Sequence, residues 1–266
     1  MTQNADWQRR FGGIARLYGD HGLQQLANSH VCVIGVGGVG SWACEALARS
    51  AIGEITLIDL DVVAESNINR QLPAMTSTLR RDKTAVLADR IREINPNCTI
   101  NIIDDFITEE NTATCLGENL DFVIDCIDSS RVKAALINHC KRKKIKVITL
   151  GGAGGQIDPS LIKVADLSQT KQDPLLSRTR KLLRMEYGFS TNLKRRFGVL
   201  CVYSEEAQRY ATDEGSFSYN KPSGTGTNLS CAGGLGSCMT VTASFALLAV
   251  SEVLKRLTAK PVSDES

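Results

Sequence analysis

Closely spaced glycines give this chain a loop that could bind the phosphates of a nucleotide. They follow the apolar run Val31–Val36 in a G-x-G-G-x-G pattern, at Gly35, Gly37, Gly38 and Gly40. Glycine allows a tight turn and lets a phosphate approach bare backbone. The helix expected behind the loop, over 41–50, would offer free N–H groups and a positive dipole end to that anion.

Acidic residues follow the next apolar strand, expected over 55–58. Asp59 and Asp61 lie about 20 positions beyond the loop, where a carboxylate suits a ribose hydroxyl. These features do not identify which nucleotide binds. A loop of this kind most often belongs to an NAD- or FAD-dependent oxidoreductase, so that class of enzyme is one possibility.

Strand and helix patterns alternate through the first 150 residues. Strands are expected over 31–36, 55–58, 99–103, 121–125 and 146–150, and helices over 41–50, 83–94, from 108 and over 131–140. This alternation predicts an α/β fold with a doubly wound, mainly parallel Rossmann-like sheet. The strand patterns at 161–167 and 197–203 predict an antiparallel C-terminal extension of the same sheet.

The predicted elements divide the chain into four parts. We expect an N-terminal helical arm over 1–30 and a nucleotide-binding core over 31–150. An extension over 151–258 would carry a basic segment, a crossover loop and a buried helix, and the tail over 259–266 is expected to be disordered.

The composition limits the kinds of protein that this chain could be. The net charge of +2 excludes a globally basic nucleic-acid binder, so any such role needs a local patch. Nine cysteines without a C-x-x-C pair, and an N-terminus without an apolar signal region, favour a reducing cytoplasm and no zinc site. The uncharged stretch 229–251 is long enough for a membrane span, but its Gly, Ser and Thr content favours a loop and a buried helix.

Further motifs change the meaning of the glycine loop. The sequence S-N-x-N-R-Q fills 66–71, Lys83 opens a helix, and D-C-x-D fills 125–128. From Arg10 to Leu257 this combination resembles the ubiquitin-activating (E1-like) superfamily, which includes the bacterial activators of sulfur-carrier proteins. The resemblance implies acyl adenylation with ATP, in which a carboxylate joins the α-phosphate and pyrophosphate leaves.

The resemblance also implies roles for single residues. Asp61, beside Asp59, would bind the ribose, and Lys83 would neutralise the leaving pyrophosphate. Asn69 and Arg70, with Asn67 nearby, would contact the phosphates. Asp128 would hold Mg²⁺, so Arg70, Lys83 and Asp128 are the catalytic candidates. Cys231 is added because relatives often place a reactive thiol there, although a buried structural cysteine is commoner.

Each of these residues has a simpler interpretation. Asp61 could cap a turn, Arg70 and Lys83 could be surface charges, and Asp128 could be the N-cap of the next helix. Asp125 is expected to support the loop rather than bind metal.

The chain departs from the sulfur-carrier activators in three places, and the third is a basic segment over 177–197. Those proteins usually carry paired C-x-x-C zinc motifs, and this chain has none. They also carry an R-Y-x-R-Q-I sequence whose second arginine reaches across a dimer. Here Gly13 stands in its place, and the sequence leaves open whether Arg16 substitutes for it.

A strongly basic segment runs from Ser177 to Phe197. Its cations, taken as RNA-binding candidates, are Arg178, Arg180, Lys181, Arg184, Lys194, Arg195 and Arg196. A solvated helix face is the alternative. A second basic run covers 141–146.

The basic segment, with the opening R-F-G-G-I-A-R-L-Y-G, resembles the tRNA threonylcarbamoyladenosine dehydratases. That branch implies ATP-dependent, ligase-type cyclisation of N6-threonylcarbamoyladenosine (t6A) next to the anticodon of tRNA. The alternative is adenylation of the C-terminal glycine of a ubiquitin-like or sulfur-carrier protein. The family also implies a homodimer. The sequence leaves open a monovalent cation site and a cysteine-desulfurase or sulfur-acceptor partner.

Overall fold

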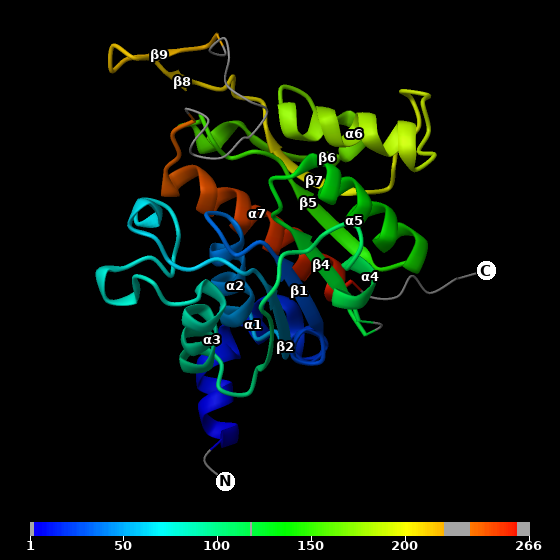
Figure 1. Ribbon diagram of the computed structural model, residues 1–266. Helices are drawn as coiled ribbons and strands as arrows, with labels where there is room; N and C mark the ends of the chain where they lie inside the picture. The colour runs from blue at the N-terminus through cyan, green and yellow to red at the C-terminus, as the bar shows by residue number, and fades with distance from the viewer. Residues whose placement is uncertain (1–2, 118, 221–234, 260–266) are drawn as a thin grey trace, which may run out of the picture.

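A seven-stranded sheet forms the centre of the computed structural model, which describes residues 3–117, 119–220 and 235–259 (Figure 1). Its strands are β1 (His30–Ile34), β2 (Glu54–Ile58), β3 (Thr99–Ile103), β4 (Phe122–Asp125), β5 (Lys146–Leu150), β6 (Ile162–Asp166) and β7 (Leu200–Ser204). The strand order is β3-β2-β1-β4-β5-β7-β6, and all neighbours are parallel except β6 and β7. The doubly wound, mainly parallel sheet with an antiparallel extension is therefore confirmed.

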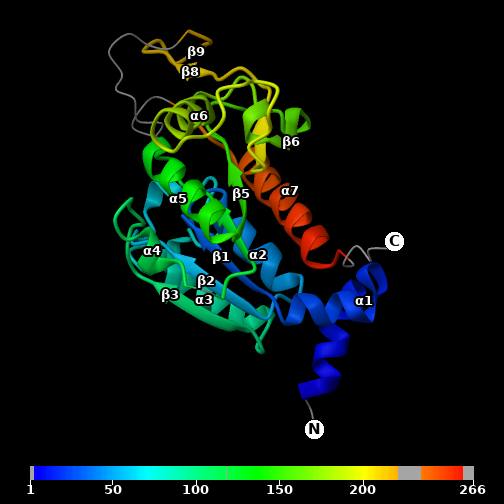
Figure 2. The same ribbon diagram turned by 90° about the vertical axis from the view of Figure 1, so that its right-hand side faces the viewer.

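Helices cover both faces of this sheet. They are α1 (Gln3–Ala27), α2 (Gly40–Arg49), α3 (Lys83–Ile94), α4 (Thr112–Cys115), α5 (Ser130–Lys143), α6 (Pro174–Glu186) and α7 (Met239–Leu257). Figure 2 shows α5 and α7 on opposite sides of the strands. One core packs α2, α3 and α7 on one face, and a second packs α5 and α6 on the other.

Alternation along β1 explains the two cores. Val31 and Val33 point into the first core, whereas Cys32 and Ile34 point into the second. All four are buried, as expected for a parallel strand covered on both faces. A continuous apolar run is therefore the pattern that this central strand needs.

Several expected boundaries were wrong, and three of them have local reasons. The first strand ends at Ile34 because Gly35 turns the chain with φ of 81°. The helix expected from Thr108 begins only at Thr112, because Thr108 and Asn111 bond to each other's backbone N–H in a turn.

The strand expected over 197–203 begins at Leu200. The carboxylate of Asp166 accepts the N–H groups of residues 197, 198 and 199, so these donors are not available to a sheet ladder. Asp166 thereby fixes the end of the basic segment to the sheet.

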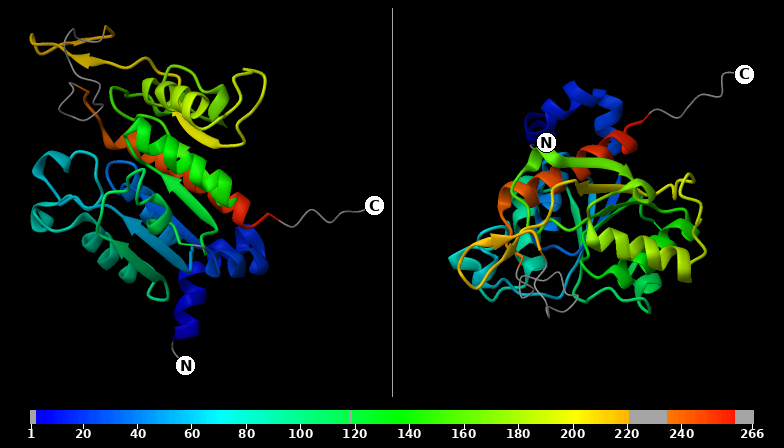
Figure 3. Two further views of the ribbon diagram at one scale, coloured as in Figure 1. Left: turned by 45° about the vertical axis from the view of Figure 1, so that its right-hand side comes forward. Right: turned by 90° about the horizontal axis from the view of Figure 1, so that it is seen from above.

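A small hairpin was missed by the sequence interpretation. β8 (Tyr210–Ala211) pairs antiparallel with β9 (Phe217–Ser218) inside 204–228, where the sequence predicts a polar connection without strands. Figure 3 shows the hairpin projecting from the body of the molecule.

None of the helices that the structure describes combines the length and apolar character of a membrane crossing. The described part of the stretch 229–251 includes the start of α7, whose Val241, Phe245 and Ala249 are buried. Cys231 and the tail over 260–266 lie outside the described residues.

Candidate active site

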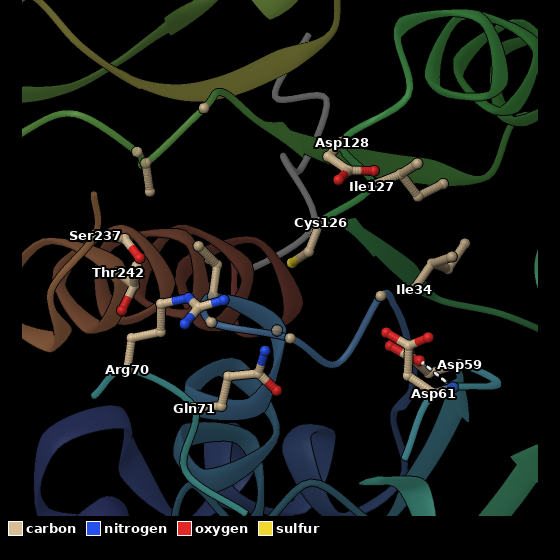
Figure 4. Close-up of a pocket in the computed structure, with 18 of the residues that line it drawn as sticks. Ile34, Asp59, Asp61, Arg70, Gln71, Cys126, Ile127, Asp128, Ser237 and Thr242 are labelled. Carbon is tan, nitrogen blue, oxygen red and sulfur yellow. Dashed lines mark hydrogen bonds between the residues drawn. The ribbon is translucent and has the colours of Figure 1, made fainter. Parts of the chain in front are cut away.

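A cleft of about 540 Å³ lies at the carboxyl edge of the sheet. The chain order reverses here, because β1 lies between β2 and β4, and open α/β sheets bind ligands at such switch points. The lining residues include the four glycines of the loop, Asp59, Asp61, Asn67, Arg70, Lys83 and Asp128. Figure 4 shows Arg70 across the cleft from Asp59 and Asp61.

The carboxylate of Asp59 holds the glycine loop in place. It accepts the N–H of Val36 at 2.7 Å and that of Asp61 at 2.9 Å. Burial raises the pKa of Asp59, while these N–H groups and nearby Lys83 favour the charged form. Asp59 therefore organises the loop, and its two oxygens are already engaged.

Two glycines are required by the shape of the loop. Gly35 has φ of 81°, which strains any residue with a Cβ. A Cβ on Gly40 would lie 2.0 Å from the carbonyl oxygen of Gly35. The loop can thus fold back onto the start of α2 only with glycine at these positions.

Lys83 and Asp61 form an ion pair at the cleft. The ammonium lies 2.7 Å from the Asp61 carboxylate, and the lysine side chain is 5% exposed against 52% for the aspartate. Lys83 is thus not a free surface charge. Its burial at the first turn of α3 gives the cleft a positioned cation.

Arg70 and Asn67 line the opposite wall, whereas Asn69 lies just outside the cleft, beside Arg70. Arg70 donates to the carbonyl of Ser66 at 2.7 Å and to the side chain of Asn69 at 2.9 Å. Asn69 in turn donates to the carbonyl of Ser237 at 2.6 Å. Asn67 is buried and accepts the N–H of Ala64, so it fixes the turn that carries Arg70.

Asp128 presents its carboxylate to the cleft (Figure 4). The N-cap position of α5 is Ser129, so the simpler interpretation of Asp128 as this N-cap was wrong. Within the described residues no three Asp, Glu, His or Cys side chains converge as a metal site, so a metal at Asp128 would need ligands from elsewhere.

A buried ion pair supports the loop that carries Asp128. Asp125 and Lys133 are 0% exposed and lie 2.8 Å apart. Thr149 donates to the same carboxylate at 2.6 Å, and the N–H of Ile127 is 3.1 Å from its other oxygen. Asp125 therefore supports the loop, as expected.

Cys126 lies in the cleft wall between these aspartates. Burial and the neighbouring Asp125 raise the pKa of its thiol to about 12. A thiol of this kind is protonated at neutral pH and is a poor nucleophile.

The cations of the basic segment fall into two groups. Arg180 donates to the hydroxyl of Thr170, and burial lowers its pKa, while Arg184 stacks 5.1 Å from the ring centre of Phe197. Both are partly buried by α6 packing. The exposed members are Lys181, Lys194, Arg195 and Arg196, and Arg178 is half-buried.

Sequence reasoning missed two polar residues. Gln71 lines the cleft, and its buried side-chain oxygen has no hydrogen-bond partner within the described part of the chain. Asp173 accepts the N–H of Gly152 at 2.9 Å and also caps α6. It thereby positions the glycine-rich stretch 151–155, part of which lines the cleft. Gln71 follows Arg70 in the same motif, which could have indicated it. Asp173 gives no such signal.

The fold and the cleft together define a nucleotide-binding α/β protein. A model of the ThiF family matches residues 11–265. The chain belongs to this family.

Several of the proteins it is similar to are tRNA-modifying enzymes by name. It is 49% identical over 260 residues to the tRNA threonylcarbamoyladenosine dehydratase of Haemophilus influenzae, covering 98% of this chain and 97% of that one. The Escherichia coli enzyme of the same name is 49% identical over 255 residues, covering 96% and 95%. A crystal structure of the E. coli dehydratase in complex with ATP has a TM-score of 0.84 at 47% identity and covers 95% of each chain.

Replacing Lys133 with methionine is expected to destabilise the fold by about 3–5 kcal/mol, because Asp125 would stay buried without its partner. Denaturant unfolding measures this loss. Lys143→Met on the exposed end of the same helix is the control, with a change within about 0.5 kcal/mol. Equal stabilities of the two variants would contradict the support role.

Proposed function

We propose that this chain catalyses the ATP-dependent dehydration of t6A in tRNA to cyclic t6A. The observation that carries the proposal is the similarity to dehydratases over almost the full length of both chains. The cleft supports it, because its glycine loop and its cations suit a nucleoside triphosphate.

The chemistry has two steps. A carboxylate oxygen of the threonyl group attacks the α-phosphorus of ATP, and pyrophosphate leaves. The carbamoyl group of the same nucleoside then attacks the activated carbonyl, and AMP leaves with the former carboxylate oxygen. The substrate supplies its own nucleophile, so no enzyme thioester is needed. The raised pKa of the Cys126 thiol agrees with this route.

The residues of the cleft divide the work of binding ATP. The N–H groups of the loop from Gly35 to Gly40 suit the phosphates, and Asp61 suits the ribose. Arg70 and Lys83 face the same space from two walls and would neutralise charge as pyrophosphate departs. Asn69 orients Arg70 through their hydrogen bond.

Mg²⁺ belongs to the same proposal. The carboxylate of Asp128 faces the cleft and is a hard oxygen ligand of the kind that Mg²⁺ prefers. Mg²⁺ usually keeps few protein ligands beside phosphate oxygens and water, so one carboxylate fits. The ion would neutralise phosphate charge.

A basic surface suits the RNA. Lys141 at the end of α5 donates to the carbonyl of Gly198 at 3.2 Å, which brings the run 141–146 beside the exposed Lys194, Arg195 and Arg196. Phosphate contacts from such cations give affinity without sequence specificity. This juxtaposition favours RNA contact over a merely solvated helix face.

A homodimer is part of the proposal as well. Leu17 on α1 is 78% exposed and Leu247 on α7 is 54% exposed. A subunit contact over these two helices would remove both side chains from water. The arm of one subunit could then supply Arg16 to the other.

Release of AMP and pyrophosphate should depend on t6A-bearing tRNA. We expect turnover with that tRNA and none with the same tRNA lacking the modification, because the threonyl carboxylate is the nucleophile. A coupled pyrophosphate assay measures it. Stimulation by a ubiquitin-like protein with a C-terminal glycine, and not by the tRNA, would instead support the carrier-protein alternative.

Lys83→Ala and Asp128→Ala should each lower turnover by about 10²-fold or more, because each removes charge that opposes the developing phosphate charge. Thermal melting should stay close to wild type. Lys255→Ala and Asp104→Ala, at exposed positions outside the cleft, are the matched controls. Gross unfolding of the cleft variants would assign them a structural role.

Reversing the charges of Arg195 and Arg196 to glutamate should weaken tRNA binding. The tRNA binding constant should also depend less steeply on salt concentration. In a plot of log binding constant against log salt concentration, the slope should decrease in magnitude by about one for each phosphate that the protein no longer neutralises. Filter binding at several salt concentrations measures both. The control is Arg92→Glu with Lys255→Glu on α3 and α7. An unchanged affinity would remove this surface from the account.

A further inference from the structure

Two aromatic rings are exposed on the projecting hairpin. Phe217 in β9 is 53% exposed, and Tyr219 just beyond it is 57% exposed. Their spacing of two along an extended chain places them on one face. The ring centres lie 5.9 Å apart at an interplanar angle of 85°.

The guanidinium of Arg209 packs against both rings of this aromatic pair. Its guanidinium carbon lies 4.7 Å from the ring centre of Phe217 and 5.9 Å from that of Tyr219. The Nε atom of Arg209 is buried, with no hydrogen-bond partner among the residues described. The guanidinium of Arg209 thus packs against both rings.

The hairpin is fixed to the wall of the cleft. The N–H of Arg209 donates to the carbonyl of Gly155 at 2.7 Å. Gln208, which lines the cleft, donates to the carbonyl of Gly154 at 3.3 Å and accepts the hydroxyl of Tyr210 at 3.1 Å. The exposed rings are thus connected to the reaction site through two consecutive residues of the chain.

The chemistry of the hairpin favours a flat, uncharged ligand face. Exposed aromatic side chains stack on unpaired nucleotide bases, which RNA presents in its loops. Asp213 and Glu214 at the turn would repel a phosphate backbone, so a base is favoured over a backbone contact.

We propose that Phe217 and Tyr219, held by Arg209, form a stacking platform for an unpaired base of the anticodon loop beside the adenosine that is modified. This proposal rests on the proposed function. It adds a contact that would hold the anticodon loop of the tRNA beside the cleft through one of its unpaired bases. The platform selects single-stranded bases by stacking, whereas the basic surface binds phosphates.

The test uses a synthetic anticodon stem-loop with 2-aminopurine beside the target adenosine. The full-length protein is compared with Phe217→Ala/Tyr219→Ala, and with Phe217→Leu/Tyr219→Leu, which keeps apolar surface but has no aromatic face. Met75→Ala is the control, because Met75 is 49% exposed and lies outside the cleft lining, the basic segment and the hairpin. The measurements are stem-loop affinity, 2-aminopurine quenching, ATP affinity and oligomeric state.

Both double variants should bind the stem-loop about 5- to 150-fold more weakly and lose the quenching, while ATP affinity stays unchanged. Wild-type affinity in the alanine double variant would overturn the proposal. So would an equal loss on a blunt duplex without a loop, or conversion of a dimer to monomers, which would make the rings a subunit contact. Wild-type protein that quenches 2-aminopurine but leaves t6A intact would instead contradict the proposed function.

Discussion

The carboxylate of Asp59 is the point on which the nucleotide site depends. It accepts the N–H groups of Val36 and Asp61, so it ties the glycine loop after β1 to the end of β2. With the loop fixed in this way, its remaining N–H groups and the start of α2 can face an anion without rearrangement. Lys83 then lies beside Asp61, at the first turn of the helix that follows this connection.

The topology of the sheet brings the other residues to the same place. The carboxyl ends of β1, β2 and β4 meet at the switch point, so residues that lie far apart in sequence line one cleft. The buried pair of Asp125 and Lys133 keeps the Asp128 loop at this edge. The same cleft could serve any adenylating enzyme. The surfaces outside it, basic on one side and aromatic on the other, are what suit an RNA substrate.

Local sequence patterns predicted the core of the fold. The bounds of α3, β3 and β5 agree with the expected ranges, because apolar periodicity and breakers such as Pro96 act over short distances. The glycine loop and the residues around Lys83 could be placed in the cleft because motif spacing carries that information. Partners that form through tertiary contacts gave no local signal: Asp173 at Gly152, Arg184 at Phe197, and Arg209 below the hairpin rings.

The central claim is tested most directly by mass spectrometry of the nucleosides of t6A-bearing tRNA, before and after incubation with the protein and Mg-ATP. The account predicts that the t6A nucleoside loses the mass of one water, only when ATP is present and Lys83 is intact. Unchanged t6A in the presence of an active, ATP-binding protein would contradict it.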